Sequence, residues 1–446
     1  MSLFQIRDYR HLFGAQLVAL GGNGLATVAL GLLAFQLAGA RAGAVLGTAL
    51  TIKMVVYVIV APIAGAYAGR FSRRRLLVGL DLTRAAAVAV LPFVDQIWQV
   101  YVLVAVLQSA SAAFTPTFQA VLPDILPDAN DYTRALSYSQ LASTMETLLS
   151  PLLAAVLVTV TGFHWLFAGT AVGFLLSAAM VVSSRIPDAA WSDRHGVVDR
   201  IFSGMRIFAA TPRLRGLLGL NLAVAAVGAI VIVNTVNLVQ QELGRSQADV
   251  AWLLAANGAG VLVIAFVTPR LLVRFTDRTV MLSGATALAV AGIVAVVLSR
   301  VPHGAWWPTL FFLWALIGVG TGAVLTPAGE VLRRSSSAPD RPALFAAQFS
   351  LSHACWLIAY PIAGWVATAA GFTTTWIVLS VLAVLGVALA WWVWPSREPE
   401  QLSHFHAEPV DHDHVVDAIP IDCGYVHSHP YVIDKEHRAW PRKVNV

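Results

Sequence analysis

Twelve stretches of about 20 or more mostly apolar residues divide the sequence, and this repetition constrains the fold more than any other feature. A helix needs about 20 apolar residues to cross the hydrocarbon core of a bilayer. Only 12% of the residues are charged, about half the density of a soluble domain. This composition excludes an ordinary soluble enzyme, a nucleic-acid binder and a disordered chain. The predicted spans are 12–38, 43–68, 76–96, 98–122, 136–160, 163–184, 214–240, 248–272, 279–299, 305–330, 344–370 and 372–395.

The arginines between the spans predict the orientation of the chain. Loops on the cytoplasmic side of a membrane carry an excess of Lys and Arg. The loops after spans 2, 6, 8 and 10 are rich in arginine, whereas the opposite loops carry only Arg41, Arg245 and Arg300. We therefore expect a multi-pass protein of the inner (cytoplasmic) membrane with both termini in the cytoplasm. No cleavable signal peptide is evident, and two cysteines argue against a disulfide scaffold.

The two halves of the chain resemble each other in order and spacing. Arg70-Phe71-Ser72 after span 2 matches Arg274-Phe275-Thr276 after span 8, and Pro151 and Gly162 match Pro361 and Gly371. We predict an all-α integral membrane protein with twelve transmembrane helices in two pseudo-symmetric six-helix bundles, built around a central site. The predicted units are an N-terminal bundle (1–184), a cytoplasmic linker (185–213), a C-terminal bundle (214–395) and a flexible His-rich cytoplasmic tail (396–446).

The loop from Gly65 to Arg75 resembles the signature Gly-x-x-x-Asp-Arg-x-x-Arg-Arg of the major facilitator superfamily. The resemblance covers about residues 12–395. It implies a cytoplasmic gate between the bundles, but Gly69 stands where the family usually has Asp, so Asp81 and Arg84 are candidates to replace that residue. Residues 114–123 with Ala129-Asn130 are similar to the macrolide-efflux and siderophore-exporter branch. The predicted gate residues are Gly65, Arg70, Arg74, Asp81 and Arg84.

Three of the ionisable residues within the predicted spans stand out. Such a group costs about 2.5–3.5 kcal/mol on insertion scales, so each one needs a reason. Glu146 in span 5, in a partly dry cavity, can load and release a proton near neutral pH, or it can be hydrogen-bonded between helices for packing. His353 in span 11 suits a proton relay, a divalent metal or a helix–helix hydrogen bond. Lys53 in span 2 pairs with a carboxylate such as Glu146 or snorkels along the cavity.

Neutral polar residues in the spans are further candidates for the transport site. Amide side chains can bind a substrate in the cavity or hold neighbouring helices together. We assign Asn23, Gln140 and Gln348 to the candidate transport and proton-coupling site. The asparagines of spans 7 and 8, with helix–helix hydrogen bonding as the favoured role, are Asn221, Asn234, Asn237 and Asn257.

The tail after the last span is rich in histidine. Alternating His and Asp in a short segment is metal-binding composition, and imidazole with carboxylate suits nickel, cobalt, zinc or iron(II). The alternatives are a solvated tail and a partner-docking tail. The arrangement resembles the His-rich tails of nickel-resistance permeases of the same superfamily. The candidate metal ligands are His404, His406, His412, His414, Cys423, His427, His429 and His437.

No sequence feature predicts an enzyme. The chain lacks a Gly-x-x-x-x-Gly-Lys phosphate loop and a visible pair of nucleophile and base, and we expect no cofactor and no nucleic-acid partner. The first hypothesis is a secondary transporter that exports a divalent transition metal such as nickel in exchange for protons across the lipid bilayer. The alternatives are proton-coupled efflux of hydrophobic drugs or siderophore-like molecules, and a membrane metal sensor.

Overall fold

The structure is a computed structural model, and it describes most of the membrane region and parts of the tail. Long uninterrupted stretches of the described residues cover both halves of the chain. The described residues are 3–67, 72–126, 128, 131, 134–135, 138–139, 142, 146, 153–154, 156–158, 160, 162–186, 197–301, 306–336, 341–396, 402–406, 419–421, 424–429, 431–433, 437 and 440.

The N-terminal half contains five described long helices, at the places that the apolar stretches predict. They are α1 (Arg7–Ala38), α2 (Ala42–Tyr67), α3 (Arg73–Val90), α4 (Ile97–Ile125) and α6 (His164–Ser183). Short 3-10 turns precede α1 (η1, Leu3–Gln5) and follow α1 and α3 (η2, Gly39–Arg41; η4, Leu91–Phe93). Only scattered residues of the predicted span 136–160 are described, so the helix of that span stays a prediction.

The C-terminal half repeats this organisation. Its elements are α8 (Pro212–Asn237), the π turn η5 (Leu238–Glu242), α9 (Gln247–Leu272), α10 (Asp277–Leu298), α11 (Trp306–Arg334), α12 (Arg341–Pro361), the π turn η7 (Ile362–Val366) and α13 (Ala367–Val393). Within the last stretch, Gly371 has φ 80° and ψ 170°, so the helical path breaks there. Gly162, its predicted equivalent in the first half, has φ 81°. Both glycines therefore have a positive φ at equivalent positions of the two halves.

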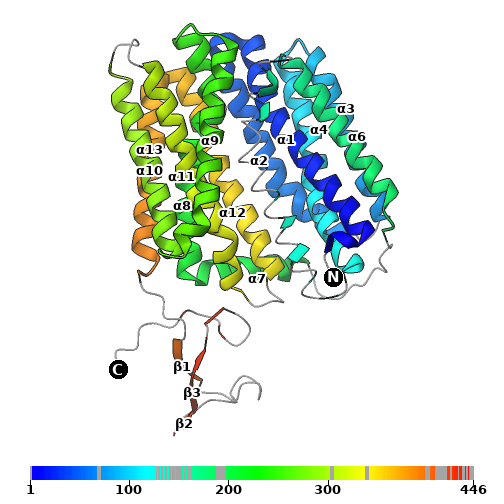
Figure 1. Ribbon diagram of the computed structural model, residues 1–446, viewed down its shortest axis with the longest axis vertical. Coiled ribbons are helices and arrows are strands. Elements are labelled where there is room, and N and C mark those ends of the chain that lie inside the picture. The colour runs from blue at the N-terminus through cyan, green and yellow to red at the C-terminus, as the bar shows by residue number, and fades with distance from the viewer. Residues whose placement is uncertain are drawn as a thin grey trace.

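The helices pair in the same pattern in both halves, which forms two bundles (Figure 1). In the first half α1 packs on α6, α2 on α4, and α3 on both α4 and α6. In the second half the corresponding pairs are α8 with α13, α9 with α11, and α10 with both α11 and α13. This equivalence matches the predicted pseudo-symmetry.

The described residues contain nine stretches long and apolar enough to cross a membrane. Two of them, of 54 and 51 residues, each run over two helices. Large apolar side chains such as Phe93, at 84% exposure, and Trp392, at 81%, point outward from the bundles. Because an acyl chain solvates such side chains and water does not, this surface fits a multi-pass membrane protein.

The predicted linker contains a helix, α7 (Val197–Ala210), that packs along α12. The contact is a backbone approach: a Cβ added at Gly204 would lie 2.1 Å from the Ala343 carbonyl oxygen. Ile207 and Phe208 are buried in the same helix. The linker is therefore attached to the C-terminal bundle.

Besides the helices, the described part of the tail contains three short strands. Strands β1 (Leu402–His406), β2 (Ile419–Ile421) and β3 (Gly424–His429) form an antiparallel sheet in the order β1-β3-β2. Figure 1 shows the beginning of α1 and this sheet at the same end of the bundles. We call it the terminal end, and the opposite one the far end.

Candidate functional site

Helix α2 of the N-terminal bundle places Lys53 and Tyr57 one turn apart and facing each other. The Lys53 Nζ lies 5.8 Å from the centroid of the Tyr57 ring. Lys53 is 11 residues from the start of α2 at Ala42, which at 1.5 Å per residue is about 17 Å. Since the hydrocarbon core is about 30 Å thick, the pair lies near the middle of the membrane.

Helix α12 of the C-terminal bundle meets α2 through an aromatic stack. The His353 ring lies parallel to the Tyr57 ring, with centroids 5.3 Å apart and an interplanar angle of 9°. Phe349 also stacks on Tyr57, at 5.8 Å and 25°. The His353 Nδ1 donates a hydrogen bond to the Phe349 carbonyl oxygen at 2.7 Å. That bond fixes the ring and leaves Nε2 for another partner.

Glu146, in the partly described segment between α4 and α6, lies within electrostatic range of this stack. Its side chain is half-buried and interacts electrostatically with Lys53, Tyr57 and Tyr360. Lys53 in turn lies within electrostatic range of His353. The structure therefore brings together the three ionisable residues that the sequence singled out. We call Lys53, Tyr57, Glu146, His353 and Tyr360 the charge cluster.

The sequence analysis missed the aromatic residues around the charges. On α12 they recur at 349, 353, 356 and 360, a spacing that places them on one helix face. The rings of Trp356 and Tyr360 are 5.0 Å apart. Gly228 of α8 leaves room for Trp356, because a Cβ there would lie 2.8 Å from its ring. The sequence shows the spacing of these aromatic residues, but it does not predict that Tyr57 lies opposite them.

The predicted amide residues lie outside the charge cluster or outside the described residues. Gln140 belongs to the residues that are not described. Asn23 on α1 and Gln348 on α12 each bury a side-chain oxygen that accepts no hydrogen bond from the described residues. Asn234, Asn237 and Asn257 donate to backbone carbonyls of neighbouring segments at 2.8, 2.9 and 3.0 Å, which is the favoured role in the sequence analysis.

The predicted cytoplasmic gate is only partly described. Arg70 lies outside the described residues, and Gly65 is placed in α2 by its backbone alone. Arg74, in the first turn of α3, donates a hydrogen bond to the Val182 carbonyl oxygen at the end of α6. This contact lies within the N-terminal bundle.

Asp81 and Arg84, the predicted replacements at the gate, form an ion pair inside the N-terminal bundle. They are 0% and 2% exposed. Ser177 of α6 donates to the Asp81 Oδ2 at 2.7 Å. The Arg84 guanidinium lies between Phe114 and Phe174, at 4.2 and 4.5 Å from the ring centroids. Residues of three helices of one bundle therefore surround the pair. This position keeps both charges away from lipid, where an unpaired charge is costly.

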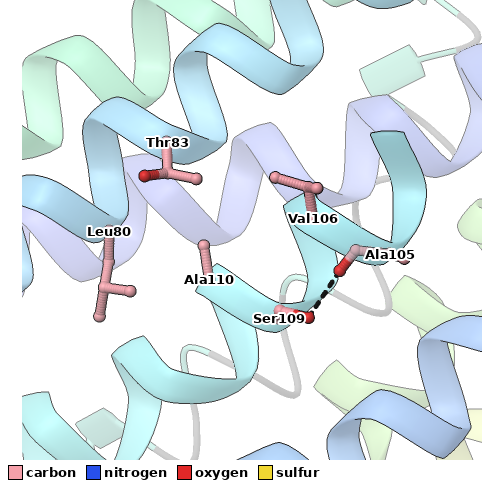
Figure 2. Close-up of a pocket in the computed structure, with 6 residues that line it drawn as sticks. All are labelled: Leu80, Thr83, Ala105, Val106, Ser109 and Ala110. Carbon is pink, nitrogen blue, oxygen red and sulfur yellow. Dashed lines mark hydrogen bonds between the residues drawn. The ribbon is translucent and has the colours of Figure 1, made fainter. Parts of the chain in front are cut away.

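A shallow groove on the outside of the N-terminal bundle is separate from the charge cluster. Figure 2 shows it between α3 and α4, with a volume of about 410 Å³. Leu80, Thr83, Val106 and Ser109 line it, and the Ser109 hydroxyl donates to its own helix at the Ala105 carbonyl. Ion pairs and acidic groups are absent from this lining, which suits lipid contact.

The candidate metal ligands of the tail are distributed over described and undescribed residues. His412, His414 and Cys423 lie outside the described residues. His404 in β1 pairs with His427 in β3, and the register places His406 and His429 on the same sheet face. His437 is separate from this sheet face: it is 3% exposed and its ring lies 4.5 Å from the ring of Tyr431.

The model of the Major Facilitator Superfamily matches residues 12–227 and, a second time, residues 216–422. The chain belongs to the Major Facilitator Superfamily. The two matches overlap by a few residues and together cover the membrane region, one match for each half of the chain.

Relatives within the Major Facilitator Superfamily include efflux proteins. The uncharacterised transporter YfiS of Bacillus subtilis (strain 168) is 26% identical over 277 residues, 58% of this chain and 62% of the relative. Macrolide efflux protein A of Enterococcus faecalis is 29% identical over 123 residues, 26% of this chain and 38% of the relative. The chain thus spans less than two thirds of either protein. The multidrug efflux pump Tap of Mycolicibacterium fortuitum is 26% identical over 333 residues, which are 71% of this chain and 79% of the relative.

Solved structures of two transporters share the fold. A bacterial homologue of the human lysosomal transporter Spinster, in an inward-facing and unoccupied conformation, superimposes with a TM-score of 0.64 at 14% identity, over 88% of this chain and 97% of that one. The nucleoside transporter NupG also superimposes with a TM-score of 0.64, at 12% identity, over 89% of this chain and 100% of that one.

Proposed function

We propose that this protein is a proton-coupled exporter of hydrophobic small molecules, and that the charge cluster between its bundles is the coupling site. The observation that carries the proposal is the stack of Tyr57 on Phe349 and His353, with Lys53 and Glu146 beside it. It joins the two bundles near the middle of the membrane, where a transporter of this architecture binds its substrate.

The chemistry of the cluster suits exchange of a proton for a substrate. Charged groups in a membrane are retained where they pair or move ions. Glu146 interacts with Lys53 while it is ionised, and a proton on Glu146 ends that attraction. In the proposed cycle, substrate binds from the cytoplasm with Glu146 ionised, and protonation from the outside releases it. His353 passes the proton, and rocking of the bundles changes the side to which the cluster opens.

The hydrophobic substrate class is supported by the aromatic lining and by the relatives. Phe349, Trp356 and Tyr360 supply flat apolar surface for an amphiphilic molecule. Macrolide efflux protein A and the multidrug pump Tap are named as exporters of this class. We therefore place hydrophobic drugs ahead of the metal that the sequence analysis favoured.

Export of a divalent metal such as nickel is the second candidate, and one observation favours it. The register of β1 and β3 sets His404 opposite His427, with two more histidines on that sheet face. Imidazoles grouped on one surface suit nickel, cobalt or zinc. In this alternative the tail supplies metal to, or senses metal for, the membrane domain.

The proposed topology has twelve membrane helices with both termini in the cytoplasm of an inner membrane. It is supported by the equivalent helix pairs of the two halves and by the shared position of the beginning of α1 and the tail sheet. The arginine-rich loops lie at that same end by sequence. In this topology the predicted helix of span 136–160 is the sixth helix of the first bundle.

A transport assay separates the two substrates. Purified protein in proteoliposomes with an imposed pH gradient is offered a macrolide or nickel, and movement of each is followed. We expect gradient-driven macrolide movement that Glu146→Gln abolishes. Glu330→Gln is the matched control, because Glu330 is an exposed carboxylate paired only locally with Arg333 in α11. Macrolide movement that is unchanged in Glu146→Gln contradicts the proposed coupling site.

The nickel arm uses point variants of the tail. Deleting the tail is unsuitable, because Tyr431 and Ile433 belong to the buried core that continues into the C-terminal bundle. His404→Ala with His427→Ala removes the opposed pair and leaves that contact. Nickel movement that falls in this variant, without macrolide movement in either protein, favours metal export over drug export.

A further inference from the structure

Glycines let the two bundles touch backbone to backbone at the far end. Gly43 and Gly47 of α2 face Gly364 of the π turn η7. A Cβ at Gly47 would lie 2.9 Å from both the Gly364 Cα and the Tyr360 carbonyl oxygen, and a Cβ at Gly364 would lie 2.5 Å from the Gly43 carbonyl oxygen. Real Cβ atoms do not occupy such distances, so any side chain at this crossing forces the bundles apart.

Two asparagines of α8 fasten the same crossing. The Asn237 Nδ2 donates to the Ala40 carbonyl oxygen of the N-terminal bundle at 2.9 Å. One turn away, the Asn234 Nδ2 donates to the Ala363 carbonyl oxygen at 2.8 Å and thereby holds η7. Asn234 also contacts the N-terminal bundle, since a Cβ at Gly43 would lie 2.9 Å from its Oδ1. We call these five residues (Gly43, Gly47, Asn234, Asn237 and Gly364) the far-end seam.

The far-end seam is balanced between closing and opening. The Oδ1 atoms of Asn234 and Asn237 are buried and accept no hydrogen bond from the described residues. A buried acceptor without a partner costs about 1–3 kcal/mol, and water can supply the partner once the seam parts. Close packing and the two donated hydrogen bonds favour the closed state, whereas the two acceptors favour the open one.

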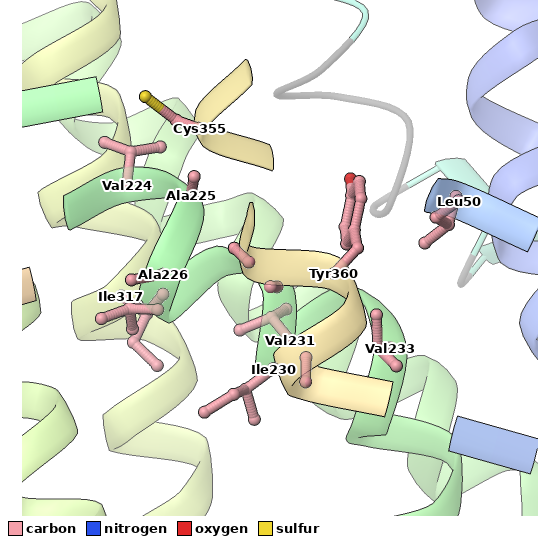
Figure 3. Packing of buried hydrophobic residues seen from close by; sticks show 14 of the residues in the cluster. Leu50, Val224, Ala225, Ala226, Ile230, Val231, Val233, Ile317, Cys355 and Tyr360 are labelled. Atoms are coloured by element: carbon pink, nitrogen blue, oxygen red, sulfur yellow. The ribbon is translucent and has the colours of Figure 1, made fainter. Parts of the chain in front are cut away.

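Tyr360 connects the seam to the charge cluster. Its carbonyl oxygen is the atom that Gly47 approaches, and its side chain interacts electrostatically with Glu146. The π turn η7 follows directly after Pro361, and π turns are concentrated at functional sites. Figure 3 draws Tyr360 with Leu50 of α2 and Val233 of α8 in the buried packing beside the seam. Separation of Gly364 from Gly47 therefore displaces the backbone of Tyr360.

We propose that the far-end seam is the gate on that side of the membrane, and that Tyr360 is the positioning residue that couples the gate to the protonation of Glu146. The inference deepens the proposed function and rests on it only for the role of Glu146. A closed seam sets Tyr360 against the charge cluster. A change of charge at Glu146 acts back on Tyr360 and shifts the seam.

Thiol labelling tests the gate without a substrate. Leu50→Cys places a thiol one turn beyond Gly47, at a position that is 2% exposed, in a background with Cys355→Ala and Cys423→Ala. A membrane-impermeant maleimide is added from each side of proteoliposomes. We expect slow labelling from the far side, and labelling about tenfold faster in Gly47→Ala or Gly364→Ala, which corresponds to about 1.4 kcal/mol. Asn237→Leu, which removes only the hydrogen bond to Ala40, should accelerate labelling less.

Gly79→Ala is the matched control, because Gly79 lies in α3 with open space around its Cα. Labelling that is unchanged by the seam variants, or that rises equally in Gly79→Ala, overturns the gate. This outcome is distinct from failure of the proposed function, because labelling requires neither transport nor a pH gradient.

A double-variant cycle tests the coupling. Glu146→Gln should change the labelling rate of the Leu50→Cys thiol several-fold, and Tyr360→Leu should remove that response while the gate variants still act. Two results overturn the role of Tyr360: a labelling rate that ignores Glu146→Gln, or a response to Glu146→Gln that persists in Tyr360→Leu.

Discussion

At the scale of single residues, charge in an apolar sequence was the dependable signal. Lys53, Glu146 and His353 stood out because ionisable groups are costly in lipid, and the structure gathers them in one cluster. Their aromatic partners could not be predicted, because nothing in one chain states that Tyr57 of α2 faces Phe349 of α12. The interior partners of Asp81 and Arg84, on α4 and α6, could not be predicted from one chain either.

His353→Phe separates the stacking of this residue from its proton chemistry. A phenyl ring keeps the contacts with Tyr57 and Phe349 but has no ring nitrogen. We expect a melting temperature in detergent close to the wild type and loss of gradient-driven transport. His164→Phe, at an exposed histidine next to Phe163, should change neither. Full transport in His353→Phe would remove the histidine from the proton path.

Arg84→Met tests the buried ion pair. It leaves the Asp81 carboxylate buried without its cation, and breaking such a pair costs about 3–5 kcal/mol. Arg84→Met combined with Asp81→Asn should recover most of that loss, since no charge is then left unpaired. Melting temperatures of the two proteins in detergent provide the measurement. Equal melting of the single and double variants would show that the pair is not a stabilising unit.

At the scale of elements, the apolar stretches predicted where the described helices lie. Helix ends differ by a few residues, because helices also include polar capping turns outside the apolar stretches. Ser246, which accepts a hydrogen bond from the Asp249 amide before α9, is an example. The helix α7 and the tail sheet were not predicted. Both are short, and each is held by a neighbour, as Gly204 against Ala343 illustrates.

Gly371→Ala tests the break in the last helical stretch. At φ 80° and ψ 170°, a residue with a side chain is strained by about 1–3 kcal/mol. We expect a lower melting temperature than wild type. Gly79→Ala, in the open middle of α3, should leave the melting temperature unchanged or slightly raise it, because alanine favours helix. Equal melting temperatures of the two variants would contradict the requirement for a glycine at position 371.

At the scale of the whole molecule, the structure shows two equivalent bundles and a tail that returns to one of them. The internal matches in the sequence predicted the equivalence. The tail could not be predicted, since its anchor combines distant residues: Arg213 donates to Ser335 at 2.7 Å and lies 5.6 Å from the Trp440 ring centroid. Tyr431 meets Trp440 edge to face at 5.3 Å.

Ile433→Asp tests the anchoring of the tail. Ile433 is 0% exposed, and a carboxylate there cannot be buried without a partner. We expect limited trypsin digestion to release the tail at least several-fold faster than in the wild type, with the membrane domain intact. Val432→Asp, at the half-buried neighbouring position, should have a smaller effect. Equal digestion of all three proteins would contradict a docked tail.

The most direct test of the central claim is proton movement that accompanies substrate. Proteoliposomes with a pH-sensitive dye inside, and no imposed gradient, receive a macrolide from outside. The charge cluster predicts that protons leave the lumen as the macrolide enters, and that Glu146→Gln abolishes this movement while Glu330→Gln does not. Macrolide entry without proton movement, or undiminished proton movement in Glu146→Gln, would contradict a coupling site at the charge cluster.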